Sequence, residues 1–228
     1  MAENEHPDGE YIPQEEESGS SDLVSPDSLR PSTLHLLPLT DRPFFPAQNL
    51  PVVMEEAPWL ETVEKIGEVP NHMAGLVLAQ GDDPHDLEPS DFYTYGTLVR
   101  IHQPGRSDGK IQFIAEGLHR FRIVRWLSSK PPYLVQVEYP EERRGEESDE
   151  VKAYAMAIIN TIKELIPLNP LYSEELKYFL NRFGPNEPSA LTDFAAALTT
   201  AEKTDLQDVV ETIPVLRRME KVLVLLRK

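Results

Sequence analysis

The stretch that most constrains this chain runs from residue 95 to residue 123 and reads YGTLVRIHQPGRSDGKIQFIAEGLHRFRI. Its apolar residues fall in short runs rich in β-branched and aromatic side chains, which is typical of strands: Leu98, Ile101, Ile111, Phe113, Phe121 and Ile123. Between the first two runs stand Asp108 and Gly109, a pair that tolerates the positive φ angles of a tight hairpin turn. The additional residues 104–106 include a proline and predict a longer loop. We predict three strands, divided at this loop and at Gly117, that form an antiparallel meander.

A sheet this small must close on itself or be covered by another layer. Residues 34–39 and 51–54 predict two more extended segments, and the prolines around them indicate a sheet edge or a crossing between sheets, because proline cannot donate a ladder hydrogen bond. Residues 55–68 predict one helix, and residues 73–80 and 133–139 predict further strands. The part of the chain from residue 33 to residue 140 is therefore expected to be β-rich.

The apolar period changes from two to 3.6 after residue 150. Five helical stripes follow, and each is marked by buried positions: Val151, Tyr154, Ile158, Ile162 and Leu165; Leu176, Phe179, Leu180 and Phe183; Leu191, Phe194, Ala195 and Leu198; Leu206, Val209, Val210 and Ile213; Leu216, Met219, Leu223 and Leu226. Thr204 and Gln207 have the spacing of a capping box, and Pro214 suits the first turn of the last helix. Consecutive stripes with short loops predict a helical bundle over residues 151–228. The last helix reaches Lys228 without a stop signal, which predicts a longer helix in a longer parent protein.

Two charged segments flank these parts. Residues 1–32 hold nine acids and one base, with few large apolar side chains. Such a segment cannot bury enough surface to offset its ordering entropy, so we predict a disordered acidic tail. A docking arm around residues 22–24 is the alternative. Residues 141–150, EERRGEESDE, predict a charged linker between the β-rich part and the helices.

Composition narrows the classes of partner. A formal net charge of −17 disfavours nucleic acid and anionic membranes, because phosphate binding needs clustered Lys and Arg. The chain has no cysteine, which excludes disulfides and thiolate sites and suits a cytoplasmic setting. No signal peptide and no apolar run of membrane-spanning length is visible.

The order of several motifs resembles a known family. Tyr95 and Gly96, a strand, the turn at Asp108 and Gly109, and then Glu116, Gly117 and Arg120 are similar to the signature of the Lon N-terminal domain, the substrate-binding domain of the ATP-dependent Lon proteases. The likeness includes LPLTDRPFFPAQNLPVVM at residues 37–54 and the strand at residues 133–138. From residue 151 onward the match is to a pattern of helices only.

This resemblance implies an α+β fold, in which a small closed antiparallel β-barrel-like lobe of the PUA-like kind, with one helix, precedes a helical bundle lobe. It implies that the chain recognises unfolded or tagged proteins for a hexameric serine protease. The ATPase and peptidase modules of that protease, with their ATP and Mg²⁺, would lie elsewhere in the parent. The motif positions Gly96, Asp108, Gly109, Gly117 and Arg120 are then structural rather than catalytic.

The first candidates for contact with such a partner are Phe44, Phe45 and Pro46. Two adjacent phenylalanines in an extended, proline-flanked loop cannot point the same way, which leaves room for one of them to be exposed and to grip apolar segments. The favoured interpretation is that both lie in the core. Trp126 and Tyr133 are the next candidates.

The segment 119–126 offers a different function. Its basic residues alternate with aromatic ones, which is the composition of an RNA-binding surface and would make the chain a stand-alone PUA-like RNA-binding module: His119, Arg120, Phe121, Arg122, Arg125 and Trp126. Strand alternation favours another interpretation, with Phe121 and Ile123 in the core and with Arg120 and Arg122 facing water or acids such as Glu116.

Signals of catalysis are weak. The Gly-Lys pair at residues 109–110 is followed by isoleucine instead of the Ser or Thr of a phosphate-binding loop, and no GxSxG motif occurs. Lys130 follows two serines on a turn before two prolines, where no apolar surroundings would activate it as a nucleophile or base. The histidines at positions 72, 85 and 102 lack metal-ligand spacing. We therefore expect no catalytic residue, no metal and no cofactor in this chain.

Overall fold

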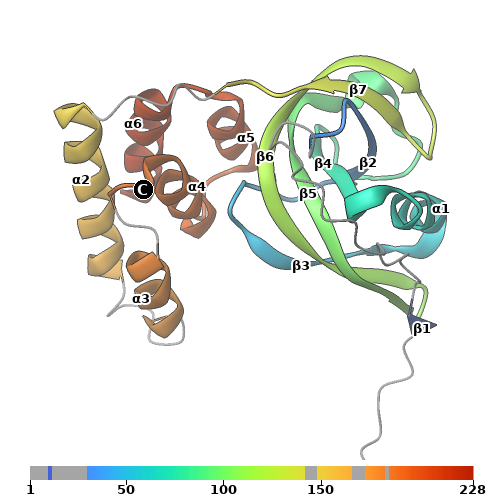
Figure 1. Ribbon diagram of the computed structural model, residues 1–228, viewed down its shortest axis with the longest axis horizontal. Coiled ribbons are helices and arrows are strands. Elements are labelled where there is room, and N and C mark those ends of the chain that lie inside the picture. Colours follow the sequence, from blue (N-terminus) through green and yellow to red (C-terminus); the bar gives the residue numbers. More distant parts are fainter. Residues whose placement is uncertain (1–9, 12–29, 142–147, 166–172, 183–184, 228) are drawn as a thin grey trace, which may run out of the picture.

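The computed structural model describes residues 10–11, 30–141, 148–165, 173–182 and 185–227, and it divides them into a strand lobe and a helical lobe (Figure 1). The strand lobe holds β1 (Glu10–Tyr11), β2 (Thr33–Leu39), β3 (Asn49–Glu55), α1 (Glu56–Gly67), β4 (Met73–Ala79), β5 (Phe92–Ser107), β6 (Lys110–Ser128) and β7 (Leu134–Glu138), with short 3₁₀ turns at Pro70–His72 and Pro89–Asp91. The helical lobe holds α2 (Asp149–Leu165), α3 (Ser173–Arg182), α4 (Pro188–Leu198), α5 (Lys203–Glu211) and α6 (Val215–Leu226).

The strands form one sheet in the order β1-β5-β4-β2-β7-β6-β3, and β5 also pairs with β6. The pairings therefore lead from β5 through β4, β2, β7 and β6 back to β5. All are antiparallel except that of β2 with β4, so the expectation of a wholly antiparallel sheet is wrong for this pair. Among the described strands, β3 pairs only with β6, which fits the edge position that its proline predicted. β2 instead lies between two strands, and its Pro38 is tolerated because it lies beyond the part of β2 that pairs with β7.

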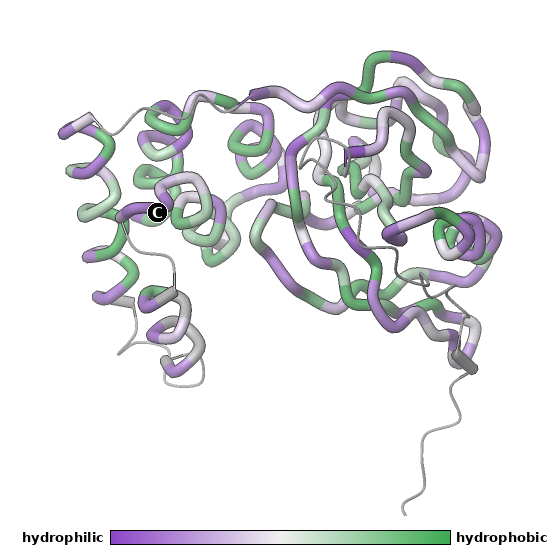
Figure 2. Tube along the Cα trace, in the orientation of Figure 1, coloured by the Kyte–Doolittle hydropathy of each residue, from purple (hydrophilic) through white to green (hydrophobic). Residues whose placement is uncertain are grey.

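The hairpin of β5 and β6 is tighter than predicted. Its turn consists of Asp108 and Gly109, at φ 53° and 72°, which are the left-handed angles of a two-residue turn. Pro104 lies within β5, because a register shift between His102 and Gly105 accommodates it. β6 also continues through Gly117, so two long strands replace the predicted meander of three. Along β6 in Figure 2, hydrophilic and hydrophobic segments alternate, as a strand with one buried face requires.

Two glycines of the predicted motif allow close contacts of the backbone. A Cβ added to Gly117 would lie 2.5 Å from the carbonyl oxygen of Phe45, and one added to Gly96 would lie 2.5 Å from that of Leu76. A side chain at either position would therefore displace main chain. Gly117 thus fixes the distance between β6 and the loop that precedes β3.

The core of the strand lobe is built from the inward faces of the strands and one face of α1. β4 is buried along its whole length, and α1 contributes Trp59, Val63 and Ile66. The alternation that predicted these positions therefore agrees with the observed burial, since Leu98, Ile101, Ile111, Phe113 and Phe121 are each at most 2% exposed.

The helical lobe has its own core, formed mainly by α2, α4, α5 and α6. Helices occur at all five predicted stripes. The predicted capping box is absent, because α5 begins at Lys203 with no side-chain cap. The side-chain amide of Gln207 donates instead to the carbonyl of Tyr95, 3.1 Å away in the strand lobe. The side chain that the local pattern assigned to the helix end thus makes a contact between the lobes.

The predicted acidic tail lies largely outside the described residues, including the docking arm at residues 22–24. Where the structure describes this segment, it is ordered by pairing. Glu10 and Tyr11 form β1 against Arg106 and Gly105 of β5, and the amide of Val137 donates to the carbonyl of Ser32 at 2.9 Å. The prediction of disorder is wrong for these residues. Of the predicted linker, residues 142–147 fall outside the described part.

Candidate functional site

The loop phenylalanines do not form an exposed surface. Phe44 is 7% exposed and lies in the core of the strand lobe, whereas Phe45 is 1% exposed and lies in the core of the helical lobe. They point in different directions, as the backbone argument required, but toward two cores. The interpretation that both lie in the core is confirmed, and the alternative that one is exposed for gripping is wrong, because the helical lobe covers the loop. Pro46 beside them is half-buried.

Of the aromatic candidates, Tyr133 lies in the core of the strand lobe, and Trp126 is partly buried and packs against that core. Trp126 and Tyr133 pack edge to face at 5.8 Å between ring centroids, in a cluster with Trp59 and Phe92. The Tyr133 hydroxyl donates to the carbonyl of Leu87 at 2.6 Å. Burial raises the pKa of Tyr133, and the charges of nearby aspartates add to the shift. Tyr133 is fully buried and therefore cannot contact a partner.

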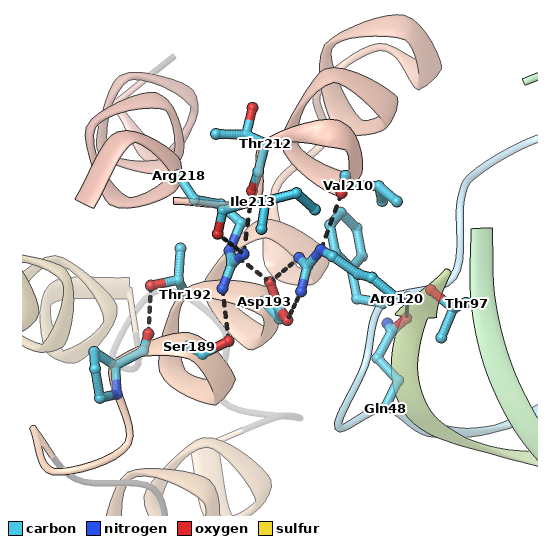
Figure 3. Close-up of polar contacts among 12 residues, drawn as sticks. Gln48, Thr97, Arg120, Ser189, Thr192, Asp193, Val210, Thr212, Ile213 and Arg218 are labelled. Atoms are coloured by element: carbon cyan, nitrogen blue, oxygen red, sulfur yellow. Dashed lines mark hydrogen bonds and ion pairs between the residues drawn. The ribbon is translucent and has the colours of Figure 1, made fainter. Parts of the chain in front are cut away.

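The strongest polar cluster joins the lobes (Figure 3). Arg120 of β6 donates from Nη1 to Asp193 Oδ2 of α4 at 2.8 Å, from Nη2 to Asp193 Oδ1, and from Nε to the carbonyl of Val210 at 3.0 Å. Arg218 of α6 places Nε 3.3 Å from the same Asp193 Oδ1. The three side chains are at most 3% exposed. The expectation that Arg120 faces water or pairs with Glu116 is therefore wrong.

Of these three side chains, two are positively charged and one is negatively charged, a surplus of one positive charge among the three. Backbone carbonyls at the end of α5 offset this surplus: Val210 accepts from Arg120, and Thr212 and Ile213 each accept from Arg218 Nη1 at 3.1 Å. Carbonyl groups at a helix C-terminus carry partial negative charge, which favours cations. Arg120 of the strand lobe thus contacts both a carboxylate and a helix end of the helical lobe, and these contacts join the two lobes.

Sequence reasoning missed Asp193 and Arg218. A usable signal was present, because each is a charged residue among the apolar positions of a predicted helix, namely the stripes around Leu191 and Met219. A charge on an apolar face indicates a buried partner. The sequence could not name that partner, because Arg120 lies 73 residues before Asp193.

The basic strand offers little continuous positive charge. Arg120 is buried, and Arg122 is paired with Glu138 at 2.7 Å, which raises the pKa of Arg122. Nearby on β5 and β6, Glu116 accepts from His102 and lies 3.6 Å from Arg100. A nucleic-acid surface at residues 119–126 is therefore not favoured.

An exposed apolar surface lies elsewhere, on the ribbon formed by β3 and β6. We call Pro51, Val53 and Ile114 the apolar strip. Pro51 lies directly opposite Ile114, and Val53 lies opposite Gln112. Directly paired residues share a face of the sheet, as do residues two apart along a strand. Val53 is 58% exposed and Ile114 is 36% exposed. The strip therefore presents branched apolar side chains on a paired, rigid strand surface.

An open depression of about 930 Å³ lies between the start of α1 and the hairpin turn. Four glutamates line it, at positions 55, 56, 61 and 64, together with His85. It therefore repels anionic ligands. Among the residues that the structure describes, no group of three His, Asp or Glu side chains could hold a metal ion, and no helix is long and apolar enough to cross a bilayer.

The structure thus defines a mixed α+β protein in which a strand lobe and a helical lobe share a buried charged junction. A family model described as the ATP-dependent protease La (LON) substrate-binding domain matches residues 33–228. The chain belongs to this family, and the resemblance drawn from its motifs is confirmed. Lon protease 2 of Hydrogenovibrio crunogenus is 45% identical over 228 residues, which are 99% of this chain and 26% of the relative. Lon protease 1 of Syntrophotalea carbinolica is 39% identical over 226 residues, which are 98% of this chain and 27% of the relative.

The chain therefore spans about a quarter of the length of these relatives, and it corresponds to their substrate-binding part. Two solved structures share its fold. The N-terminal domain of the Mycobacterium avium complex Lon protease has a TM-score of 0.67 at 20% identity, and the match covers 86% of this chain and 98% of that one. The Lon N-terminal domain protein from Xanthomonas campestris has a TM-score of 0.59 at 19% identity and is matched over 97% of its length, 84% of this chain.

Proposed function

We propose that this chain recognises unfolded or tagged proteins and delivers them to an ATP-driven hexameric serine protease. The ATPase and peptidase modules, which use ATP and Mg²⁺, would be other parts of the same polypeptide and would carry the catalysis, while this part supports hexamer assembly. Membership of the substrate-binding family supports the proposal, as does the share of the relatives' length that this chain covers. The complete lack of cysteine suits a cytoplasmic setting.

The organisation expected from the sequence remains part of this proposal. The strand lobe would be a closed PUA-like barrel spanning residues 33–140, followed by a linker at residues 141–150 and a helical lobe at residues 151–228. The order of strand pairings, which returns to β5, supports the closed barrel. A closed, well-packed lobe holds surface side chains in fixed positions, so little entropy is lost when they bind a partner.

The observation that carries the proposal is the exposure of the apolar strip. Folded proteins bury most apolar side chains, so an unfolded chain is recognised by the apolar segments that it exposes. Pro51, Val53 and Ile114 offer a small contact for such segments. A contact of this size binds weakly, and six copies on one ring would strengthen it through avidity.

The test replaces Val53 and Ile114 by serine and measures the affinity for a reduced, carboxymethylated protein by fluorescence anisotropy. We expect the affinity of the double variant to fall about fivefold to thirtyfold, because each of the two replacements removes apolar contact worth about 0.5–1 kcal/mol. The folded domain should keep its unfolding midpoint, since both side chains are exposed.

Val124→Ser is the matched control. Val124 is 53% exposed, close to the 58% of Val53, and it lies on β6 beyond the part that pairs with β3. The control should bind as the unchanged chain does. Equal affinities for the strip variant and the unchanged chain would contradict the proposal, as would an equal loss in the control.

A further inference from the structure

The outer edge of β5 has a short stretch that accepts an additional strand. β4 pairs with β5 only as far as Arg100. Beyond that residue, the strand that the structure places on this side of β5 is β1, opposite Gly105 and Arg106. The stretch is bounded on one side by the register shift after His102, with Gln103 at φ 50°, and on the other by the hairpin turn. Irregularities of this kind limit how much of an edge another strand can pair with.

β1 shows what kind of chain this edge accepts. It is a two-residue antiparallel strand from the acidic N-terminal segment, and it is connected to the rest of the fold through the 18 residues from 12 to 29. Addition of a strand to a sheet edge uses main-chain hydrogen bonds, which do not depend on the sequence of the added chain. An edge with this property suits a partner that is extended and variable in sequence.

The same row of paired residues connects this edge to the apolar strip. Tyr11 lies opposite Gly105, Gly105 lies opposite Gln112, and Gln112 lies opposite Val53. Neighbouring strands are about 4.8 Å apart, so the position of β1 is roughly 14 Å from β3 across the ribbon. A partner chain that pairs at the edge with one part can therefore lay the apolar side chains of another part on the strip.

We propose that the edge of β5 at Gly105 and Arg106 is a strand-addition site for an extended segment of an unfolded polypeptide, and that Glu10–Tyr11 occupies this site until such a segment displaces it. The inference rests on the proposed function. It adds how the unfolded polypeptide binds, by strand addition, and it identifies Glu10–Tyr11 as a competitor within the same chain. Two main-chain pairings give a weak contact. The internal strand is therefore formed in the structure and is still weak enough to leave.

The experiment compares the full chain with Tyr11→Pro, using the carboxymethylated protein as the probe. Proline removes the donor at Tyr11 and disfavours strand addition. Because the unoccupied edge is then available to the probe, we expect its affinity to rise about twofold to tenfold. Ser20→Pro is the matched control, since it places the same residue in the N-terminal segment outside β1, and it should leave the affinity unchanged.

A second measurement follows the peptide that contains residues 10–11 by hydrogen exchange with mass spectrometry. Saturating probe should increase exchange in this peptide while residues 105–106 remain protected. Unchanged affinity for Tyr11→Pro, or unchanged exchange at residues 10–11 on binding, overturns the inference. If the strip variant still loses affinity in that case, the proposed function stands without this binding mode. If the full chain and all variants fail to bind the probe, both are overturned.

Discussion

Asp193 accepts from Arg120 with both carboxylate oxygens, and one of these also lies 3.3 Å from Arg218. A buried ion pair gains little over an apolar pair, because desolvation of the charges offsets their attraction. Removal of one partner is a different matter, because the remaining charges stay buried without compensation. At the scale of single residues, replacement of Asp193 is therefore expected to destabilise the fold strongly, although no catalytic role is expected of this residue.

Asp193→Ala should lower the free energy of unfolding by about 3–5 kcal/mol, because two buried guanidinium groups lose their carboxylate. Urea denaturation measures the change. Asp208→Ala is the matched control, because Asp208 is exposed and pairs with Lys221 on the surface; it should cost less than about 1 kcal/mol. Equal costs for the two variants would show that the cluster is not buried as described.

At the scale of elements, the long strands β5 and β6 organise the strand lobe. β6 pairs with β3 along its first part and with β7 along its last part, so a single strand joins three neighbours. Two glycines make this possible in different ways. Gly109 closes the hairpin at positive φ, whereas Gly117 allows the loop before β3 to lie against β6.

Alanine substitutions should separate these two roles. Gly117→Ala should cost about 1–3 kcal/mol, because the added Cβ meets the backbone at Phe45 and the loop must move. Gly109→Ala should cost about 1–2 kcal/mol through backbone strain alone, since nothing lies within 4 Å of its added Cβ. Gly81→Ala is the control, because it has neither a near neighbour nor a positive φ. Thermal or urea unfolding ranks the three, and a neutral Gly117→Ala would contradict the close approach.

At the scale of the whole molecule, the two lobes share groups across their junction. Phe45 enters the core of the helical lobe. Arg42 donates to the carbonyls of Ala197 and Thr199 at 3.1 and 2.9 Å, and Lys203 donates to that of Thr40 at 3.1 Å. Together with the cluster around Asp193, these contacts stabilise each lobe through the other. We therefore expect the two lobes to unfold together.

The two tryptophans make this coupling measurable, because Trp59 and Trp126 both lie in the strand lobe. Tryptophan fluorescence therefore reports on the strand lobe, while circular dichroism at helical wavelengths reports mainly on the other lobe. The two urea transitions should coincide in the unchanged chain. In Asp193→Ala we expect them to separate, with the helical transition moving to lower urea. Separate transitions in the unchanged chain would show that the lobes are independent.

The sequence by itself determined the local features, because they depend on residues close together in the chain. Strand alternation gave the buried face of β5 and β6, the 3.6 period gave the five helices of the second lobe, and the order of short motifs gave the family. The Asp-Gly turn was visible too, but its length was misjudged, because a bulge that absorbs a proline depends on the neighbouring strand.

Only the tertiary structure decided what each conspicuous side chain does. Arg120 looked like a surface group and Phe45 could have been exposed, and both are buried because the helical lobe packs against the strands at that place. Val53 and Ile114 looked like ordinary strand residues, and they remain exposed because no described element covers their face of the ribbon. Burial depends on contacts between segments far apart in sequence. A local sequence pattern does not indicate which distant segment will pack against it.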